Sequence, residues 1–126
     1  MMAFVVIGAA TMATAADPDN PNRVEKQRAD LAGAPGFEVV NSITTYRKGE
    51  GVPLHYHNGA ESAYVVQGTT IRRQGKPAPE LLATGTVLMN ARGVIHGGYV
   101  IVGDTPLILF SVHAVDKGKP LYVWVK

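Results

Sequence analysis

Turn-forming residues divide this chain of 126 residues into short apolar segments, and that punctuation limits the folds open to it. Fourteen glycines and eight prolines are present, most of them after position 30. The segments between them are rich in β-branched and aromatic residues, and none has a convincing helical period. Short segments bounded by turns predict an all-β sandwich or barrel, and the length suits a single domain with one core.

The expected strands follow from this succession of turns and apolar runs. The best defined is 37–47, where Val39, Val40 and Ile43 precede a Thr-Thr-Tyr run. Residues 23–30 are polar and could form an edge strand or one helical turn; we favour the strand. The remaining expected strands are 52–57, 62–67, 69–74, 81–82, 86–90, 94–102, 107–115 and 121–125.

Composition excludes several classes of function. The chain has no cysteine, so thiolate catalysis, cysteine-ligated zinc and disulfide bonds are ruled out. With 46% hydrophobic residues and a net charge of +2, it is a globular chain without a strongly basic surface. The densest basic pairs are Arg47-Lys48 and Arg72-Arg73, without aromatic interleaving. We interpret both pairs as solvated surface at strand ends and expect no nucleic-acid partner.

The N-terminal residues 1–16 resemble a secretory signal peptide. They carry no charge and end near Ala13-Thr14-Ala15, a cleavage pattern of small residues. The usual basic residue before the apolar run is missing, and the alternative is a buried or loose N-terminal segment. The run is shorter than the ~20 residues of a typical membrane span. We therefore expect a periplasmic or secreted protein with no membrane span in the mature chain, an N-terminal arm at 17–36 and a barrel domain at 37–126.

Four side chains are the candidate metal ligands: His55, His57, Glu61 and His96, which include three of the four histidines in the chain. Alternate residues of a strand face the same side, so His55 and His57 can reach one ion together. The small residues at 58–60 can turn the chain and bring Glu61 back, whereas His96 must come from a distant segment. Three neutral imidazoles and one carboxylate suit Mn, Fe, Ni, Cu or Zn and leave coordination positions for a ligand.

These residues lie in two segments that resemble the paired motifs of the cupin superfamily, in particular its small single-domain bacterial members. The first segment spans 49–68 and the second spans 85–100. The matching positions are Gly49, His55, His57, Glu61, Gly68, Gly85, Gly93 and His96. Ala91 stands where the family usually has proline, and Val100 where it usually has asparagine. The resemblance implies a jelly-roll β-barrel of two antiparallel sheets, with one divalent transition metal ion held inside by the four candidate ligands.

Three further residues are predicted near the ion. Val100 lies four residues beyond His96, so strand alternation points both inward together with Gly98. Gly98 would leave open volume there, while Val100 would form an apolar wall or simply fill core. His113 stands alone in an apolar strand, where it is a core or pocket-wall residue or, alternatively, a proton-transfer group. Tyr99 is out of phase with His96 and is expected outside the cavity.

The resemblance leaves the reaction open, because the family includes dioxygenases, isomerases, lyases and non-catalytic binding proteins. The first hypothesis is a metal-dependent enzyme acting on a small oxygen-rich molecule, with Glu61 also serving as a general base. The alternative is a periplasmic module that binds or senses a metal-chelated small molecule. A third interpretation treats the ion as a folding staple. By analogy with the family, we expect a homodimer.

Overall fold

The computed structural model describes residues 16–17 and 19–126, so the predicted signal segment lies outside the described residues except for Ala16. The described part of the chain has no helix long and apolar enough to cross a membrane. It consists of strands joined by turns and loops. The strands are β1 (Ala16–Asp17), β2 (Asn20–Asp30), β3 (Phe37–Tyr46), β4 (Gly51–Val52), β5 (His55–Tyr56), β6 (Gly59–Gln67), β7 (Thr69–Arg73), β8 (Glu80–Leu82), β9 (Val87–Asn90), β10 (Tyr99–Ile101), β11 (Leu107–Asp116) and β12 (Val123–Trp124).

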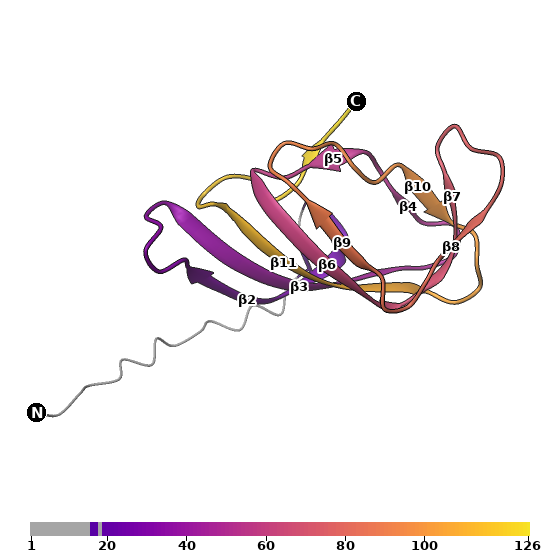
Figure 1. Cartoon of the computed structure of the whole chain (residues 1–126), viewed down its shortest axis with the longest axis horizontal. Helices are drawn as coiled ribbons and strands as arrows, with labels where there is room; N and C mark the ends of the chain where they lie inside the picture. Colours follow the sequence, from indigo (N-terminus) through magenta and orange to yellow (C-terminus); the bar gives the residue numbers. More distant parts are fainter. Residues whose placement is uncertain (1–15, 18) are drawn as a thin grey trace, which may run out of the picture.

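Two antiparallel sheets make the barrel, which confirms the predicted fold class (Figure 1). The larger sheet has the strand order β1-β2-β3-β11-β6-β9, and the smaller has the order β4-β10-β7-β8. Neighbouring strands that are distant in the sequence are typical of a jelly roll. A third sheet, the pair β5 and β12, was not expected; it brings the C-terminal segment against the strand that carries His55.

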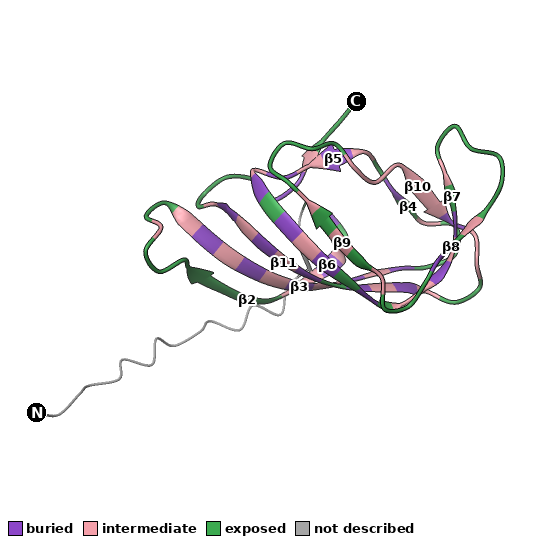
Figure 2. Cartoon of the chain, in the orientation of Figure 1, coloured by how far each residue is buried: buried purple, intermediate pink, exposed green. Residues whose placement is uncertain are grey.

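Alternation along the central strands gives the larger sheet an inner and an outer face (Figure 2). Because β11 pairs with β3 on one side and β6 on the other, inner side chains form rows across all three strands. One row joins Val40, His113 and Glu61, and Ser42 and Ser111 lie buried beside it. Buried polar side chains are costly without partners, so this patch of polar side chains on the inner face indicates a functional site.

Two apolar clusters fill the interior on either side of this patch. The larger comprises Tyr46, Val52, Val65, Ile71, Leu82, Ile101, Leu107 and Leu109, and the smaller comprises Val40, Val115, Leu121 and Tyr122. Full burial of an aliphatic side chain contributes about 1.5–3 kcal/mol, so the apolar clusters can hold the barrel together without help from the polar patch.

Two expected strands are shorter in the structure than predicted. The strand at 52–57 is interrupted because Pro53 has no N–H to donate to a ladder. Of the predicted strand 94–102, only residues 99–101 form a strand in the structure. The preceding residues Gly97 and Gly98 have positive φ values of 87° and 71°, which extended strands do not have.

The polar segment 23–30 is a strand, as favoured from the sequence. It forms most of β2, which pairs along β3 from Arg23 to Asp30. Much of the segment expected as an arm, 17–36, therefore belongs to the larger sheet.

Candidate metal centre

The structure brings the four predicted ligands together. His55 lies on β5, His57 follows it directly, and Glu61 lies on β6. His96 precedes β10 and joins His55 through two backbone hydrogen bonds, with N–O distances of 3.0 and 2.8 Å. One ring nitrogen from each imidazole lies within 4.8 Å of the other two. Glu61 Oε2 is 3.3 Å from His57 Nε2 and 3.2 Å from His96 Nε2.

Backbone carbonyls fix the orientation of all three imidazoles. The Nδ1 atoms of His55, His57 and His96 donate to carbonyl oxygens at 2.8, 2.7 and 2.8 Å, respectively. These carbonyls belong to Pro53, Leu121 and Val94. Since Nδ1 carries a proton, a ring in its neutral form keeps its Nε2 lone pair for the site, the arrangement usual for metal-ligating histidines. Burial also lowers the pKa of His55 to about 4, which keeps that ring neutral at pH 7.

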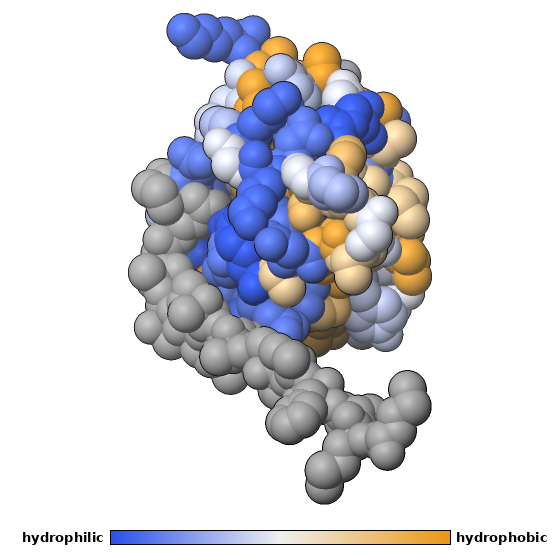
Figure 3. Space-filling model, turned by 90° about the vertical axis from the view of Figure 1, so that its left-hand side faces the viewer, coloured by the Kyte–Doolittle hydropathy of each residue, from blue (hydrophilic) through white to orange (hydrophobic). Residues whose placement is uncertain are grey.

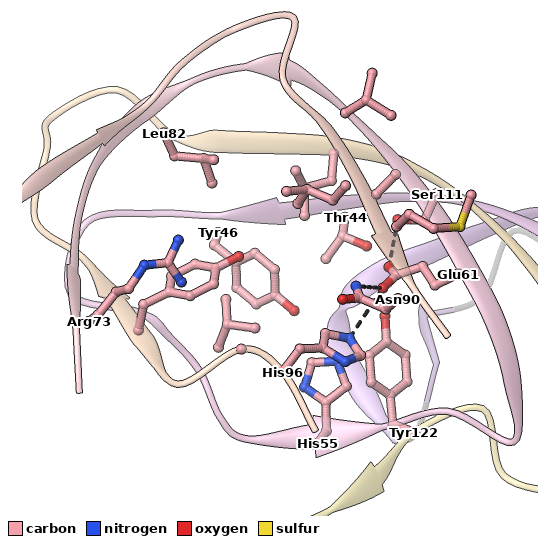
Figure 4. A pocket seen from close by; sticks show the side chains of 18 residues that line it. Thr44, Tyr46, His55, Glu61, Arg73, Leu82, Asn90, His96, Ser111 and Tyr122 are labelled. Atoms are coloured by element: carbon pink, nitrogen blue, oxygen red, sulfur yellow. Dashed lines mark hydrogen bonds and ion pairs between the residues drawn. The ribbon is translucent and has the colours of Figure 1, made fainter. Parts of the chain in front are cut away.

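Glu61 is held in place by two neutral donors (Figure 4). Asn90 Nδ2 donates to Oε2 at 2.9 Å, and Ser111 Oγ donates to Oε1 at 3.2 Å. Burial alone would raise the pKa of Glu61, but in the metal-free site the rings of His57 and His96 can also carry a proton on Nε2 and donate it to the carboxylate, so the pKa of Glu61 lies well below the usual range. Glu61 is therefore a carboxylate at neutral pH, which is the form that ligates a cation.

The unpaired nitrogens of the cluster test whether a metal fits these residues. Nε2 of His57 and of His96 are buried and have no hydrogen-bond partner, although both face the carboxylate of Glu61. Lone pairs that face one another in a buried site are unfavourable, and a cation between them satisfies all of them at once. A mixed set of imidazoles and one carboxylate fits a divalent transition metal ion and does not select among Mn, Fe, Ni, Cu and Zn.

A cavity of about 270 Å³ opens beside the ligands (Figure 4). His55, Glu61 and His96 line one end of it. Its other lining residues are Thr44, Tyr46, Val52, Ala63, Arg73, Leu82, Val87, Leu88, Met89, Asn90, Gly97, Tyr99, Leu109, Ser111 and Tyr122. Mostly apolar walls with a few convergent polar groups are typical of small-molecule sites, and this volume is at the small end of their range.

No protein-family model and no curated protein match the sequence. Solved structures do share its architecture, among them three with TM-scores above 0.5. The polyketide cyclase RemF from Streptomyces resistomycificus matches with a TM-score of 0.54 and 17% identity over 100% of this chain and 88% of its own. A double-stranded β-helix protein from Klebsiella pneumoniae matches at 0.52 and 17%, over 87% of this chain and 90% of its own. The DMSP lyase DddQ from Ruegeria pomeroyi DSS-3 matches at 0.53 and 18%, over 69% of this chain and only 43% of its own.

This chain has a cupin fold. At 17–18% identity the likeness shows the fold alone, and the chemistry has to be argued from the side chains.

His113 lies behind the ligands of this cupin barrel rather than in the cavity wall. On β11 it faces Glu61 across the sheet, with Nε2 at 3.5 Å from Oε1, and it is fully buried. Neither ring nitrogen has a hydrogen-bond partner, and His57, Glu61 and His113 form a second group that could hold a metal ion. Burial lowers the pKa of His113 to about 3, so the ring is neutral. Its place among the ligands follows from strand pairing, which the sequence pattern did not reveal.

The predicted inner wall of Gly98 and Val100 differs from what the structure shows. Both line a second, open groove and not the cavity, whereas Tyr99, which was expected outside, lines the cavity. The prediction assumed strand alternation from His96 onward, and the left-handed backbone at Gly97 and Gly98 breaks that alternation.

The sequence analysis missed several polar residues of the site, among them Arg73, Asn90 and Ser111. Arg73, interpreted as solvated surface, lines the cavity. It shares the inner face of β7 with Thr69 and Ile71, a period-two pattern that could have revealed it. Asn90 and Ser111 hold Glu61, and the sequence offers no signal for them because their contacts depend on the register of β9 and β11 against β6.

Proposed function

We propose that this protein is a metal-dependent enzyme that acts on a small oxygen-rich molecule. The observation that carries the proposal is the pairing of a buried, metal-suited ligand set with an adjoining cavity in which a substrate could reach the ion. A site that only stapled the fold would need no such cavity. A bound divalent ion would supply Lewis-acid polarisation of a substrate oxygen.

The protein residues around the cavity orient a substrate and limit its contact with water. Burial raises the pKa of Tyr46 to about 12 and raises the pKa values of Tyr99 and Tyr122 as well, so all three hydroxyls stay protonated. Tyr46 accepts a hydrogen bond from Asn20 Nδ2 at 2.9 Å, which leaves its own hydrogen free to donate. Three hydroxyl donors in an apolar cavity suit a substrate rich in oxygen acceptors.

Within this proposal, Glu61 is a metal ligand and not the general base. The low pKa of Glu61 makes its carboxylate a weak base, and donors from Asn90 and Ser111 occupy both oxygens. Proton abstraction by Glu61 would require it to leave these partners. The reaction that we propose is of the dioxygenase, isomerase or lyase type.

Metal analysis of the purified protein tests the proposal. We expect one divalent transition metal ion per chain, loss of that ion in His57→Ala, and its retention in Thr45→Ala, which alters the outer face of β3. Full metal content in His57→Ala would overturn the site. A metal-loaded protein that binds small oxygen-rich molecules and converts none of them would instead favour the binding or sensing module.

Export to the periplasm or medium is also proposed, on the resemblance of residues 1–16 to a signal peptide. N-terminal sequencing of protein recovered from the periplasmic and culture fractions of the host tests it. A chain beginning near Asp17 is expected, and an uncleaved chain confined to the cytoplasm would contradict it.

A second copy of the chain is the partner we propose for the outer face of the larger sheet. One cross-strand row on that face joins Val24, Ile43, Phe110, Tyr64 and Val87. Tyr64 and Val87 are 47% and 67% exposed, and Figure 3 shows hydrophobic side chains gathered toward one side of the molecule. Because the row carries no charge, two copies can pack it against itself without like-charge repulsion. Sedimentation should show a dimer that Tyr64→Lys dissociates, and a monomeric wild-type protein would end the proposal.

A further inference from the structure

Arg73 is the one arginine or lysine among the residues that line the metal cavity within the described part of the chain. It ends β7, where its register partner on β10 is Tyr99. Figure 4 shows it at the opposite end of the cavity from His55, His96 and Glu61. The cavity is therefore polarised, with the metal ligands at one end and a guanidinium at the other.

Two contacts hold the Arg73 side chain and leave part of it available. Its Nε donates to Glu80 on β8, and its Cζ lies 5.7 Å from the centre of the Tyr99 ring. No hydrogen bond to a described residue engages either terminal nitrogen of Arg73. An arginine fixed through Nε can still present its two terminal nitrogens as a fork, the geometry that matches a carboxylate.

The charge at this end fits a monoanion better than a phosphate. Glu80 offsets part of the charge on Arg73, and no second cation among the described residues lines the cavity. A single guanidinium that already shares its charge with Glu80 accommodates one further carboxylate at its free terminal nitrogens, whereas a phosphate dianion would leave a larger charge unbalanced. The walls between the two ends include Val52, Leu82 and Leu109, which suit a short apolar segment.

We propose that the ligand is a small carboxylic acid that spans the cavity, with its carboxylate on the fork of Arg73 and an oxygen function at the opposite end facing His55, His96 and Glu61. This assignment rests on the proposed function, since the oxygen function is meant for a metal bound by those residues. It narrows the substrate from oxygen-rich molecules in general to oxo or hydroxy acids with a short apolar middle. Arg73 is then the residue that sets specificity for the acid.

Calorimetric titration of the metal-loaded protein with matched probes tests the assignment. The probes are straight-chain oxo acids of four to seven carbons, with the oxo group remote from the acid, each paired with its methyl ester. We expect at least one acid to bind between ~10-fold and ~100-fold more tightly than its ester, because only the acid forms charge-assisted hydrogen bonds. Arg73→Gln should abolish that preference while leaving the affinity for the ester unchanged.

The neighbouring arginine provides a matched control. Arg72 is exposed and points to the other face of β7, where it pairs with Val100, so Arg72→Gln should keep the preference for the acid. Unchanged ester affinity and metal content in Arg73→Gln show that the variant is folded. Glu80→Gln removes the competing carboxylate and should leave the acid bound at least as tightly.

The outcomes separate this inference from the proposed function. If the wild-type protein takes up metal but prefers no acid over its ester, the assignment of Arg73 is overturned and the metal site stands. Equal losses of acid and ester affinity in Arg73→Gln would overturn it too. If the protein takes up no metal, the proposed function fails, whatever the titrations of Arg73 show.

Discussion

Asn90 shows how a single side chain can control the candidate metal site without being one of its predicted ligands. Its amide donates to Glu61 Oε2 at 2.9 Å and so fixes the oxygen that faces His57 and His96. Loss of such a partner typically weakens metal binding 10- to 100-fold, so we expect Asn90→Ala to do so by about 30-fold. Competition with a metallochromic chelator measures the affinity.

A matched asparagine on the outer face controls for that change. Asn41 Nδ2 bonds Gln27 on the neighbouring strand, away from the ligands, so Asn41→Ala should leave metal affinity unaltered. Equal affinities of the Asn90→Ala and wild-type proteins would show that Glu61 needs no support from this amide.

Glu61 supplies the only carboxylate of the predicted ligand set. Glu61→Gln keeps the shape and removes the charge that draws a divalent ion into a buried site. Because the loss of a supporting residue already costs 10- to 100-fold, the loss of this ligand should weaken metal binding by more than ~100-fold. Titration followed by elemental analysis tests this, and a variant with wild-type stoichiometry at micromolar metal would contradict it.

The convergence of the four candidate ligands could be predicted from the sequence, but the residues that support them could not. The spacing of His55, His57 and Glu61 within one segment already restricts where the three side chains point. His113 and Ser111 reach Glu61 only because β11 pairs with β6 in one register, and a shift by one residue would turn both outward. That register is a property of the whole sheet, which no local pattern reveals.

At the scale of elements, Gly97 lies against the carbonyl oxygen of Pro53, an atom on which both the local fold and the site depend. Its φ is +87°, and a Cβ there would lie 2.6 Å from the Pro53 carbonyl oxygen and 3.2 Å from His55 Nδ1. That carbonyl is the one that orients His55. We expect Gly97→Ala to lower the free energy of unfolding by about 3 kcal/mol, through backbone strain and the clash together, and to impair metal binding.

Substitution of Gly93 is a control that introduces backbone strain without a steric clash. Its φ is +71°, but a Cβ there meets nothing within 4 Å. Gly93→Ala should therefore cost only about 1 kcal/mol and leave the metal site intact. Urea denaturation of both variants measures the difference, and equal losses would mean that the contact with Pro53 relaxes freely.

The elements that the sequence predicted best are those with unbroken alternation. β3 and β11 match the expected strands to within one residue at either end, because buried and less buried residues alternate without a break along both strands. The segment around His96 was predicted poorly, because alternation rules do not apply across two successive glycines with positive φ. Because of this error the sequence analysis placed Tyr99 outside the barrel, whereas the structure places it in the cavity wall.

At the scale of the molecule, the predicted ion would join all three sheets. His55 belongs to the two-stranded sheet, Glu61 to the six-stranded sheet, and His96 leads into the four-stranded one. The larger apolar cluster contains none of these residues, so the metal-free protein should still fold. The ion should therefore act as a stabilising ligand of a folded barrel rather than as its sole staple.

Thermal unfolding with and without metal decides between these roles. A ligand at 100 times its dissociation constant adds about 2.7 kcal/mol, which for a domain of this size raises Tm by about 10 °C. We expect that rise in the wild-type protein, a cooperative transition at lower temperature after chelation, and no metal-dependent rise in Glu61→Gln. A chelated protein without a cooperative transition would mean that the ion is required for folding. A Tm that is the same with and without metal would mean that the three sheets are not joined through this site.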